Sequence, residues 1–271
     1  MDTRPIGVFD SGMGGLTAVR QMIRLLPGED IVYFGDTGRV PYGGRSVETI
    51  VRYARQDVAF LRSFDLKAIV IACGTVSTTA LHLLKNENAI PILGVVQPAA
   101  NAAVQATKSG NIGIIGTKAT IRSGAYEASI RALLPEAKLT AKACPLLVPL
   151  VEDGRVRRGD FVTERVVEEY LSPVKAAGVD TLVLGCTHYP LLADVISDYM
   201  GAGVTLIDTG EQAALAAAAL LGEQGRLNDA SRAGERRYYA SDSAADFAAT
   251  ASLYLGADIS GLVERVAIEN Y

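Results

Sequence analysis

The chain has 271 residues, of which 49% are hydrophobic and 21% are charged, and its formal net charge is -4. A chain of this length and composition can bury a substantial core, which excludes a disordered or fibrous protein. The slightly acidic balance, without any long run of lysine and arginine, excludes nucleic acid as the expected partner.

The N-terminal residues run directly into a predicted strand and lack the apolar core of a signal peptide. The most apolar later stretch, residues 213–221, is roughly half as long as a segment that spans a bilayer. We therefore expect a cytoplasmic protein with no membrane partner. In that compartment its three cysteines should be reduced, and their odd number argues against a disulfide framework.

Predicted strands and helices alternate over the first third of the chain. We expect, in order, a strand over 6–10, a helix over 16–26, a strand over 30–34, a helix over 47–61, a strand ending at Cys73, a helix over 77–84 and a strand over 91–95. Glycine-rich turns follow the first two strands, over 11–15 and 35–44, and Ser46 is placed to cap the second helix. This alternation indicates a parallel sheet with helices on both faces.

The pattern starts again in the middle of the chain. Residues 111–117 repeat the beginning of the sequence, with Thr117 in the place of Ser11. We expect a helix from Ser123 to residue 134, a helix over 160–177, strands over 181–185 and 204–208, a helix over 211–221, a strand over 237–241 and a helix over 244–255. Pro173 should kink its helix or mark the weak point of that helix.

We interpret the repeat as two pseudo-symmetric, doubly wound α/β lobes with mainly parallel sheets and an active site in the cleft between them. Residues 1–97 and 211–271 are expected to form the first lobe, because the last strand and helix are too long to be a tail and should return to complete it. Residues 98–210 then form the second lobe. Each lobe carries a cysteine at a comparable place, Cys73 in the first and Cys186 in the second.

Both of these cysteines follow the pattern of a buried strand. Residues 181–185 are a mostly apolar run that ends in a small residue directly before Cys186. Residues 68–72 show the same pattern directly before Cys73. Open α/β sheets gather their ligand groups at the carboxyl ends of the strands. Two facing thiols can remove the α proton of an amino acid on one face and supply a proton on the other, without metal or pyridoxal. Backbone amides after each cysteine should lower the thiol pKa below about 8.5.

Other uses of the cysteines are weaker hypotheses. A single cysteine after an apolar run is usually a small buried side chain, which is what we expect for Cys144. Zinc could be held by Cys73, Cys186 and His188, but no fourth ligand and no CxxC spacing accompany them. The glycine-rich turn over 12–15 fits neither the dinucleotide nor the P-loop motif.

Further polar residues accompany the two cysteines. His188 can assist the nearby thiol or serve as a structural histidine. Asp10 can attract a substrate ammonium, help Cys73 or cap the following helix. For Glu152, a catalytic role and a structural role are both possible. Hydrogen-bond donors suited to carboxylates come from Ser11, Thr75, Thr187 and the backbone amides around Tyr42 and Gly43.

These residues fall in segments that together resemble the glutamate racemases over essentially the whole chain. The segments are residues 10–16, 33–37, 40–43, 72–75, 144–146, 149–152 and 185–191. The resemblance implies a cofactor-independent enzyme that interconverts L- and D-glutamate and supplies D-glutamate for peptidoglycan, and so for cell wall biogenesis and cell shape. It also implies a two-lobed cytoplasmic enzyme that is commonly a homodimer.

The same resemblance implies roles for individual residues. Cys73 and Cys186 would be the acid and base pair, with Asp10 and His188 as their assistants, and we add Glu152 as a further catalytic candidate. Substrate contacts would fall on Asp10, Ser11, Tyr42, Gly43, Gly74, Thr75, Thr187 and His188. We expect no metal and no cofactor.

One position departs from the family's pattern, because Gly74 stands where asparagine usually follows the first cysteine. An amide side chain that would contact the substrate is missing, while the Gly74 N–H and the Thr75 hydroxyl remain. The chain also starts almost at the first strand, so we do not expect regulation by an activator through an N-terminal extension.

Three other functions remain open at this point. An aspartate racemase of the same superfamily would share the paired thiols and differ in the length of its substrate. A binding protein that grips an amino acid between its lobes would need neither cysteine. A pyridoxal enzyme would need a Schiff-base lysine and would carry a coloured cofactor.

Overall fold

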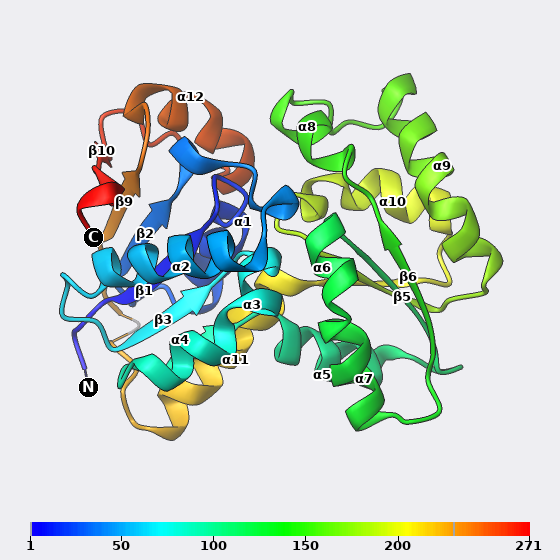
Figure 1. Ribbon diagram of the computed structural model, residues 1–271, viewed down its shortest axis with the longest axis horizontal. Coiled ribbons are helices and arrows are strands. Elements are labelled where there is room, and N and C mark those ends of the chain that lie inside the picture. Colours follow the sequence, from blue (N-terminus) through cyan, green and yellow to red (C-terminus); the bar gives the residue numbers. More distant parts are fainter. Residues whose placement is uncertain (1, 230) are drawn as a thin grey trace.

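Two parallel sheets organise the protein, whose computed structural model describes residues 2–229 and 231–271. The first sheet has the strand order β10-β9-β2-β1-β3-β4, and the second has the order β6-β5-β7-β8. Figure 1 shows the two sheets side by side with their helices around them. The expected α/β fold with parallel sheets is confirmed, since the strand pairings within these ranges are all parallel. Among the helices of these residues, none combines the length and apolar character that a membrane crossing requires.

The first sheet is covered by helices on both faces. Its strands are β1 (Ile6–Asp10), β2 (Ile31–Gly35), β3 (Ala68–Ile71), β4 (Ile92–Gly94), β9 (Arg236–Ala240) and β10 (Val263–Arg265). Successive residues point to opposite faces, so Val8 packs against one set of helices and Phe9 against another. The Val8 face carries α1 (Leu16–Leu25), α11 (Thr209–Glu223) and α12 (Ala244–Leu255), and the Phe9 face carries α2 (Val47–Leu61), α3 (Gly74–Thr79) and α4 (Leu81–Glu87).

The second sheet is built in the same way. Its strands are β5 (Asn111–Gly116), β6 (Lys138–Ala143), β7 (Thr181–Gly185) and β8 (Thr205–Asp208). One face packs against α5 (Val96–Ala106) and α7 (Ala125–Leu133), and the other against α8 (Leu147–Glu152), α9 (Phe161–Ala176) and α10 (Ala193–Met200). Leu184 of this sheet belongs to the same hydrophobic cluster as Leu16 of α1, so the two sheets share a continuous core.

The remaining elements are short. They are α6 (Lys118–Ser123) and the 3-10 turns Thr37–Arg39, Tyr42–Gly44, Tyr189–Leu192 and Ile268–Asn270. We propose that residues 1–97 and 211–271 form the first lobe and residues 98–210 the second. The parallel pairing of β9 with β2 supports this division, because it places the C-terminal part of the chain beside the N-terminal strands.

One helix expected to be continuous is interrupted. The helix expected over 77–84 is two helices, α3 and α4, that meet at Ala80. The Thr78 hydroxyl donates to Thr75 O within α3, and such a bond weakens a helix. The helix expected from Ser123 to residue 134 is α7, and Gly124, whose φ is 63°, separates it from the preceding helix α6.

Six helices and strands of the described residues were not expected from the sequence, namely α5, α6, β6, α8, α10 and β10. β6 is only partly buried and therefore lacks an apolar run, and β10 has only three residues. The helix α9 continues through Pro173 as far as Ala176. The Ser172 hydroxyl donates to Glu169 O, 3.4 Å away, which is the carbonyl that the missing N–H of Pro173 leaves free.

Candidate active site

A cleft of about 410 Å³ opens between the two sheets at the carboxyl ends of β1, β3 and β7. Because parallel strands end at the same edge of a sheet, the residues that follow these strands meet there. Every residue predicted as catalytic or substrate-binding lines this cleft, namely Asp10, Ser11, Tyr42, Gly43, Cys73, Gly74, Thr75, Glu152, Cys186, Thr187 and His188. Their chemical roles stay predictions.

The cleft also contains residues that the sequence did not point out. Thr117 and Lys118 come from the start of α6, and Pro145, Val148 and Pro149 come from the region of α8. Thr117 carries a usable signal, because it occupies the place of Ser11 in the internal repeat. Pro145 and Pro149 fall in segments that resemble the glutamate racemases, whereas Val148 carries no such signal.

Cys73 lies on the first wall of the cleft, between β3 and α3. Its Sγ is 3.4 Å from the Ser11 hydroxyl, to which the thiol can donate. Burial raises the pKa of Cys73 to about 12 and the Asp10 carboxylate adds to the effect, against hydrogen bonds from Ser11 and Val76. The expectation of a lowered pKa is therefore wrong for Cys73, because α3 has only six residues and burial outweighs its amides.

Cys186 lies on the opposite wall and begins a chain of polar contacts. Its Sγ is 3.7 Å from His188 Nδ1, and His188 Nε2 is 3.1 Å from Glu152 Oε1. Burial lowers the pKa of His188, but hydrogen bonds with Cys186 and Glu152 and the charges of Cys186 and Asp10 raise it to about 10. The imidazole is therefore protonated at neutral pH, and a positive charge beside a thiol favours the thiolate.

Asp10 ends β1 and is only 1% exposed. Its Oδ1 accepts a hydrogen bond from the Thr187 hydroxyl, 3.4 Å away on the second wall. Burial raises the pKa of Asp10 to about 6, while the charge of His188 and hydrogen bonds from Gly15 and Thr187 oppose the rise. At neutral pH the carboxylate is therefore mostly ionised, and it can hold a positively charged group in the cleft.

The glycine-rich turn after β1 allows the two walls to meet. A Cβ on Gly14 would lie 2.6 Å from His188 Nδ1, which is too close for any side chain. The Thr17 hydroxyl, just beyond the turn, donates to Thr187 O over 3.0 Å. The turn therefore serves close packing around the second wall, which explains why it fits no phosphate-binding motif.

Gly74 permits a second close approach across the cleft. A Cβ on Gly74 would lie 2.6 Å from the carbonyl oxygen of Gly185. Beside it, the hydroxyls of Thr75 and Thr117 are 3.1 Å apart and join the two walls. The asparagine that the resembling family usually carries at position 74 would therefore require Gly185 to move.

Tyr42 lines the cleft, but its hydroxyl is engaged elsewhere. The side chain is buried, and the hydroxyl contacts Asp36 and lies 3.1 Å from Asp57 Oδ2. The hydroxyl is therefore not free for a ligand. The backbone amides around Tyr42 and Gly43 stay the predicted donors on this side of the cleft.

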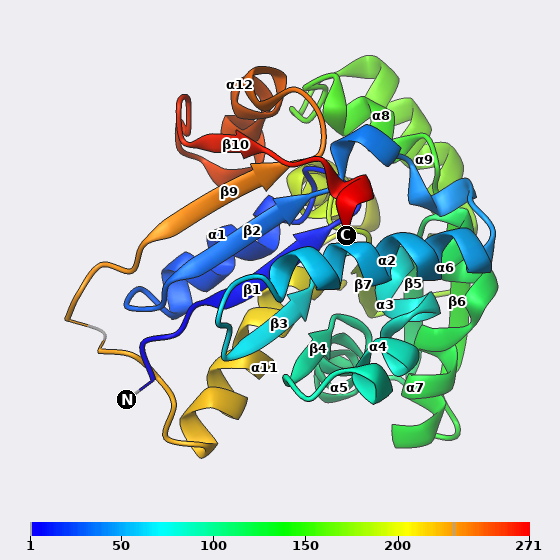
Figure 2. The same ribbon diagram turned by 60° about the vertical axis from the view of Figure 1, so that its left-hand side comes forward.

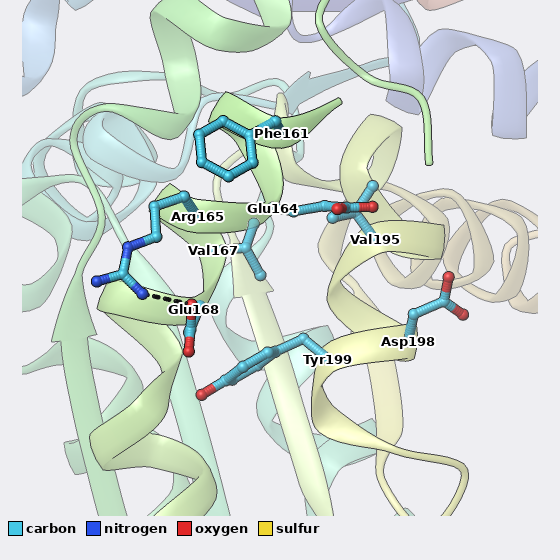
Figure 3. Close-up of a pocket in the computed structure, with 8 residues that line it drawn as sticks. All are labelled: Phe161, Glu164, Arg165, Val167, Glu168, Val195, Asp198 and Tyr199. Atoms are coloured by element: carbon cyan, nitrogen blue, oxygen red, sulfur yellow. Dashed lines mark hydrogen bonds and ion pairs between the residues drawn. The ribbon is translucent and has the colours of Figure 1, made fainter. Parts of the chain in front are cut away.

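A second cavity, of about 370 Å³, lies between α9 and α10 and shares no residue with the cleft (Figure 3). Its Glu168 is paired with Arg165, and its Asp198 is paired with Arg158, each over 2.6 Å. No cysteine or histidine is among its lining residues. Within residues 2–229 and 231–271, no group of three His, Cys, Asp or Glu side chains is placed to hold a metal ion. The cleft is therefore the candidate active site.

The amino-acid sequence matches a known family over most of its length. The pattern of the Asp/Glu/Hydantoin racemase family matches residues 6–218. A glutamate racemase of Geobacter metallireducens is 44% identical over 99% of this chain and 98% of its own length. A glutamate racemase of Streptococcus gordonii is 46% identical over 96% of this chain and 98% of its own length.

Solved structures share the fold. A glutamate racemase from Bacillus anthracis superposes with a TM-score of 0.92 at 40% identity and covers 98% of both chains. A glutamate racemase from Francisella tularensis, in complex with D-glutamate, superposes with a TM-score of 0.91 at 37% identity over 100% of both chains. An aspartate racemase from Picrophilus torridus is similar in fold alone, with a TM-score of 0.56 at 20% identity.

Proposed function

The chain belongs to the Asp/Glu/Hydantoin racemase family and is an isomerase, and we propose that it is a glutamate racemase that works with two cysteines and no cofactor. The observation that carries the proposal is the placement of Cys73 and Cys186 on opposite walls of one cleft. The similarity to curated glutamate racemases over nearly the whole chain supports glutamate as the substrate.

The cleft offers partners for each charged group of glutamate. The substrate carries one ammonium group and two carboxylates at neutral pH. Asp10 is the anionic partner for the ammonium group, since its carboxylate lies in the cleft and is ionised. The carboxylates would be bound by backbone amides around Gly43 and Gly74 and by the hydroxyls of Thr75 and Thr187, which would turn to the substrate from their present partners Thr117 and Asp10.

The two thiols have different roles at the start of the reaction. We assign the role of base to Cys186, whose Sγ lies 3.7 Å from the His188 imidazolium, whereas Cys73 keeps its proton because burial raises its pKa to about 12. The Cys186 thiolate removes the α proton on its side, and the Cys73 thiol supplies a proton on the opposite face. In between, the electron pair of the broken Cα–H bond is delocalised into the α-carboxylate, which hydrogen-bond donors of the cleft stabilise.

The reverse reaction starts from the opposite distribution of protons. Cys186 is then the thiol and Cys73 the thiolate, which the Ser11 hydroxyl and the substrate ammonium beside Asp10 stabilise. Glu152 is 44% exposed and bonded to His188, so it offers a route by which this wall exchanges protons with water.

We also propose the cellular role that the family implies. A cytoplasmic homodimer would supply D-glutamate for peptidoglycan, and therefore for the cell wall and cell shape. Rescue of a bacterial strain that requires D-glutamate for growth would test this role.

The reaction itself can be tested with purified protein and L-glutamate in D2O, with reductant and chelator present and without pyridoxal. We expect the α-proton signal to disappear from the proton NMR spectrum while the optical rotation decays. Cys73→Ser and Cys186→Ser should each abolish racemisation and keep the fold, because a serine hydroxyl is a far weaker acid than a thiol. Cys144→Ser is the matched control and should stay active, since Cys144 does not line the cleft.

Each alternative gives a different outcome in the same experiment. Exchange with L-aspartate but not L-glutamate would support an aspartate racemase. Binding of an amino acid without loss of its α-proton signal would support a binding protein. Full activity in either of the two cleft variants would rule out the two-thiol mechanism.

A further inference from the structure

The loop between β2 and α2, residues 36–46, extends from the first sheet to the second wall of the cleft. Val40, Tyr42 and Gly43 line the cleft. A Cβ on Gly43 would lie 3.1 Å from Thr117 Cβ, so the loop lies close against the start of α6. Figure 2 shows the loop passing beside α6 before it enters α2. Any shift of this loop would therefore move the backbone amides that we propose as substrate contacts.

Four side chains, which we call the loop anchor, hold this loop against α2: Asp36, Arg39, Tyr42 and Asp57. Asp36 and Asp57 are fully buried, and Tyr42 is 1% exposed. Arg39 Nε donates to Asp36 Oδ2 over 2.6 Å, and Arg39 Nη2 donates to Asp57 Oδ1 over 2.9 Å. The Tyr42 hydroxyl contacts Asp36 and is 3.1 Å from Asp57 Oδ2. The anchor therefore joins the start and the middle of the loop to Asp57 of α2.

Asp36 accepts more hydrogen bonds than Asp57 does. Its carboxylate receives hydrogen bonds from Arg39 and Tyr42, and the Ser241 hydroxyl donates to Asp36 Oδ1 over 2.7 Å. Three donors around one carboxylate favour the ionised form. The guanidinium of Arg39 is the only positive charge in the anchor, so one ionised carboxylate already balances it.

Hydrogen-bond accounting favours a proton on Asp57. The Tyr42 hydroxyl has one hydrogen and lies between two carboxyl groups, so it can donate to only one of them. If Asp36 receives that hydrogen, the Tyr42 oxygen must accept one from Asp57 Oδ2. Burial and the charge of Asp36 raise the pKa of Asp57 well above its usual value, which agrees with a neutral carboxyl group.

We propose that the loop anchor is a positioning device for the proposed glutamate site, in which ionised Asp36 and neutral Asp57 fix the loop amides around Gly43 for a substrate carboxylate. Neither aspartate lines the cleft. The anchor therefore acts on substrate binding through the loop and not on the proton transfer between the thiols. The functional part of this inference rests on the proposed glutamate racemase activity.

Kinetics of matched variants test the positioning role. Asp57→Ala removes two hydrogen bonds and should raise KM for glutamate about tenfold, with a much smaller change in kcat. Asp57→Asn should restore KM to within about twofold of the original protein, because an amide can donate to Tyr42 and accept from Arg39. Asp36→Asn leaves the buried Arg39 charge without an anion and should raise KM at least as much as Asp57→Ala. Asp65→Asn, at an exposed aspartate, is the control.

Infrared spectroscopy tests the proton assignment without any activity measurement. The spectrum of the original protein minus that of Asp57→Asn at pH 7 should contain the C=O band of a protonated carboxyl group. The same difference for Asp36→Asn should contain a carboxylate band. Circular dichroism would confirm that each variant is folded. If Asp57→Ala or Asp36→Asn unfolds, the infrared spectrum of Asp57→Asn decides whether Asp57 is neutral.

The outcomes separate the two proposals. A carboxylate band for Asp57, or an Asp57→Asn variant as impaired as Asp57→Ala, would overturn the assignment of a neutral Asp57. An unchanged KM in folded Asp36→Asn would overturn the positioning role. Absence of racemisation in the original protein would instead contradict the proposed function, while the infrared result would still test the anchor.

Discussion

Asp10 is nearly fully buried and yet ionised at neutral pH, so its charge costs free energy in the folded protein. Its pKa is about 6 in the folded state, compared with 3.8 for the unperturbed group. A raised pKa means that the folded state binds the proton more tightly than the unfolded state does. The stabilising effect of the proton is complete below about pH 4 and is lost as the pH rises through about 6.

We therefore expect Asp10→Asn to be more stable than the original protein at pH 7 by about 3 kcal/mol, because a neutral amide carries no charge to bury. The advantage should shrink towards zero at pH 4, where Asp10 is protonated. Urea denaturation at both pH values measures this difference in the free energy of unfolding.

Asp153→Asn, at an exposed carboxylate, is the control for the Asp10→Asn variant. An advantage of equal size at both pH values would contradict this account. Racemisation should be lost, since the variant no longer attracts an ammonium group.

The sequence predicted which residues meet in the cleft better than it predicted their protonation. Asp10, Cys73 and Cys186 each follow an apolar run, and strand ends are recognisable in a single sequence. The direction of the Cys73 pKa shift was wrong because it depends on burial, to which residues from distant parts of the chain contribute. The pairing of Glu152 with His188 depends on α8, an element with no clear sequence signal.

At the scale of secondary structure, the start of α3 and the end of β7 are held together by two glycines. Gly74 is the first residue of α3 and Gly185 is the last residue of β7. Each glycine directly adjoins one of the two cleft cysteines in the sequence. The spacing between the thiols therefore depends on the absence of a side chain at position 74.

Gly74→Ala should lower kcat/KM for glutamate by about a hundredfold, because its Cβ would lie 2.6 Å from a backbone oxygen and push the two walls apart. Steady-state kinetics, with circular dichroism to confirm folding, measures the effect. Gly203→Ala is the matched control, since a Cβ there has no neighbour within 4 Å. Equal activity of the two variants would show that the close approach at Gly74 is not needed.

Strands were easier to predict than helix boundaries. Strands such as β1, β3 and β7 are buried on both faces, so each is a short and uninterrupted apolar run. The division at Ala80 was missed because the Thr78 hydroxyl competes for a carbonyl of the helix without changing the apolar pattern of the sequence. Ser46 was predicted correctly as a cap, and its hydroxyl accepts a hydrogen bond from Thr49 N.

At the scale of the whole molecule, a buried ion pair ties distant parts of the chain together at the end of the first sheet that lies opposite the cleft. Lys67 and Glu29 are paired and are 0% and 2% exposed. Lys67 Nζ also donates to Asp2 O and Arg226 O, over 2.8 and 3.0 Å, and Glu29 accepts from Asn228 N. The pair therefore joins the N-terminal segment, two strand starts and the segment after α11.

We expect Glu29→Gln to lower the free energy of unfolding by about 3–5 kcal/mol, because Lys67 would stay buried without its anionic partner. Asp198→Asn is the matched control for loss of a carboxylate. It breaks an exposed pair with Arg158 and should cost less than about 1 kcal/mol. Urea denaturation measures both values. The rate of racemisation by Glu29→Gln should be unchanged at a temperature where this variant is folded. An equal loss of unfolding free energy in Glu29→Gln and Asp198→Asn would contradict the role of burial.

The strand order of the whole molecule was only partly predictable. Alternating strands and helices indicate parallel sheets, and the repeat of the first strand at residues 111–117 indicates a second one. The position of β9 beside β2 is a contact between opposite ends of the chain, and no local pattern encodes it. Buried charges such as Lys67 cannot be told from surface charges in the sequence, because their partners come from distant segments.

The pairing of β2 with β9 also bears on how the chain is made. β2 is apolar and buried along its whole length, and one of its edges is covered only by β9. As the ribosome extends the chain, the four strands of the second sheet emerge before β9 does, so that sheet can be complete while the first is not. Until residues 236–240 emerge, the nascent chain presents an open edge of unpaired amides and carbonyls. A newborn chain is therefore most prone to aggregate just before β9 emerges from the ribosome, and a premature stop codon upstream of β9 would make that condition permanent.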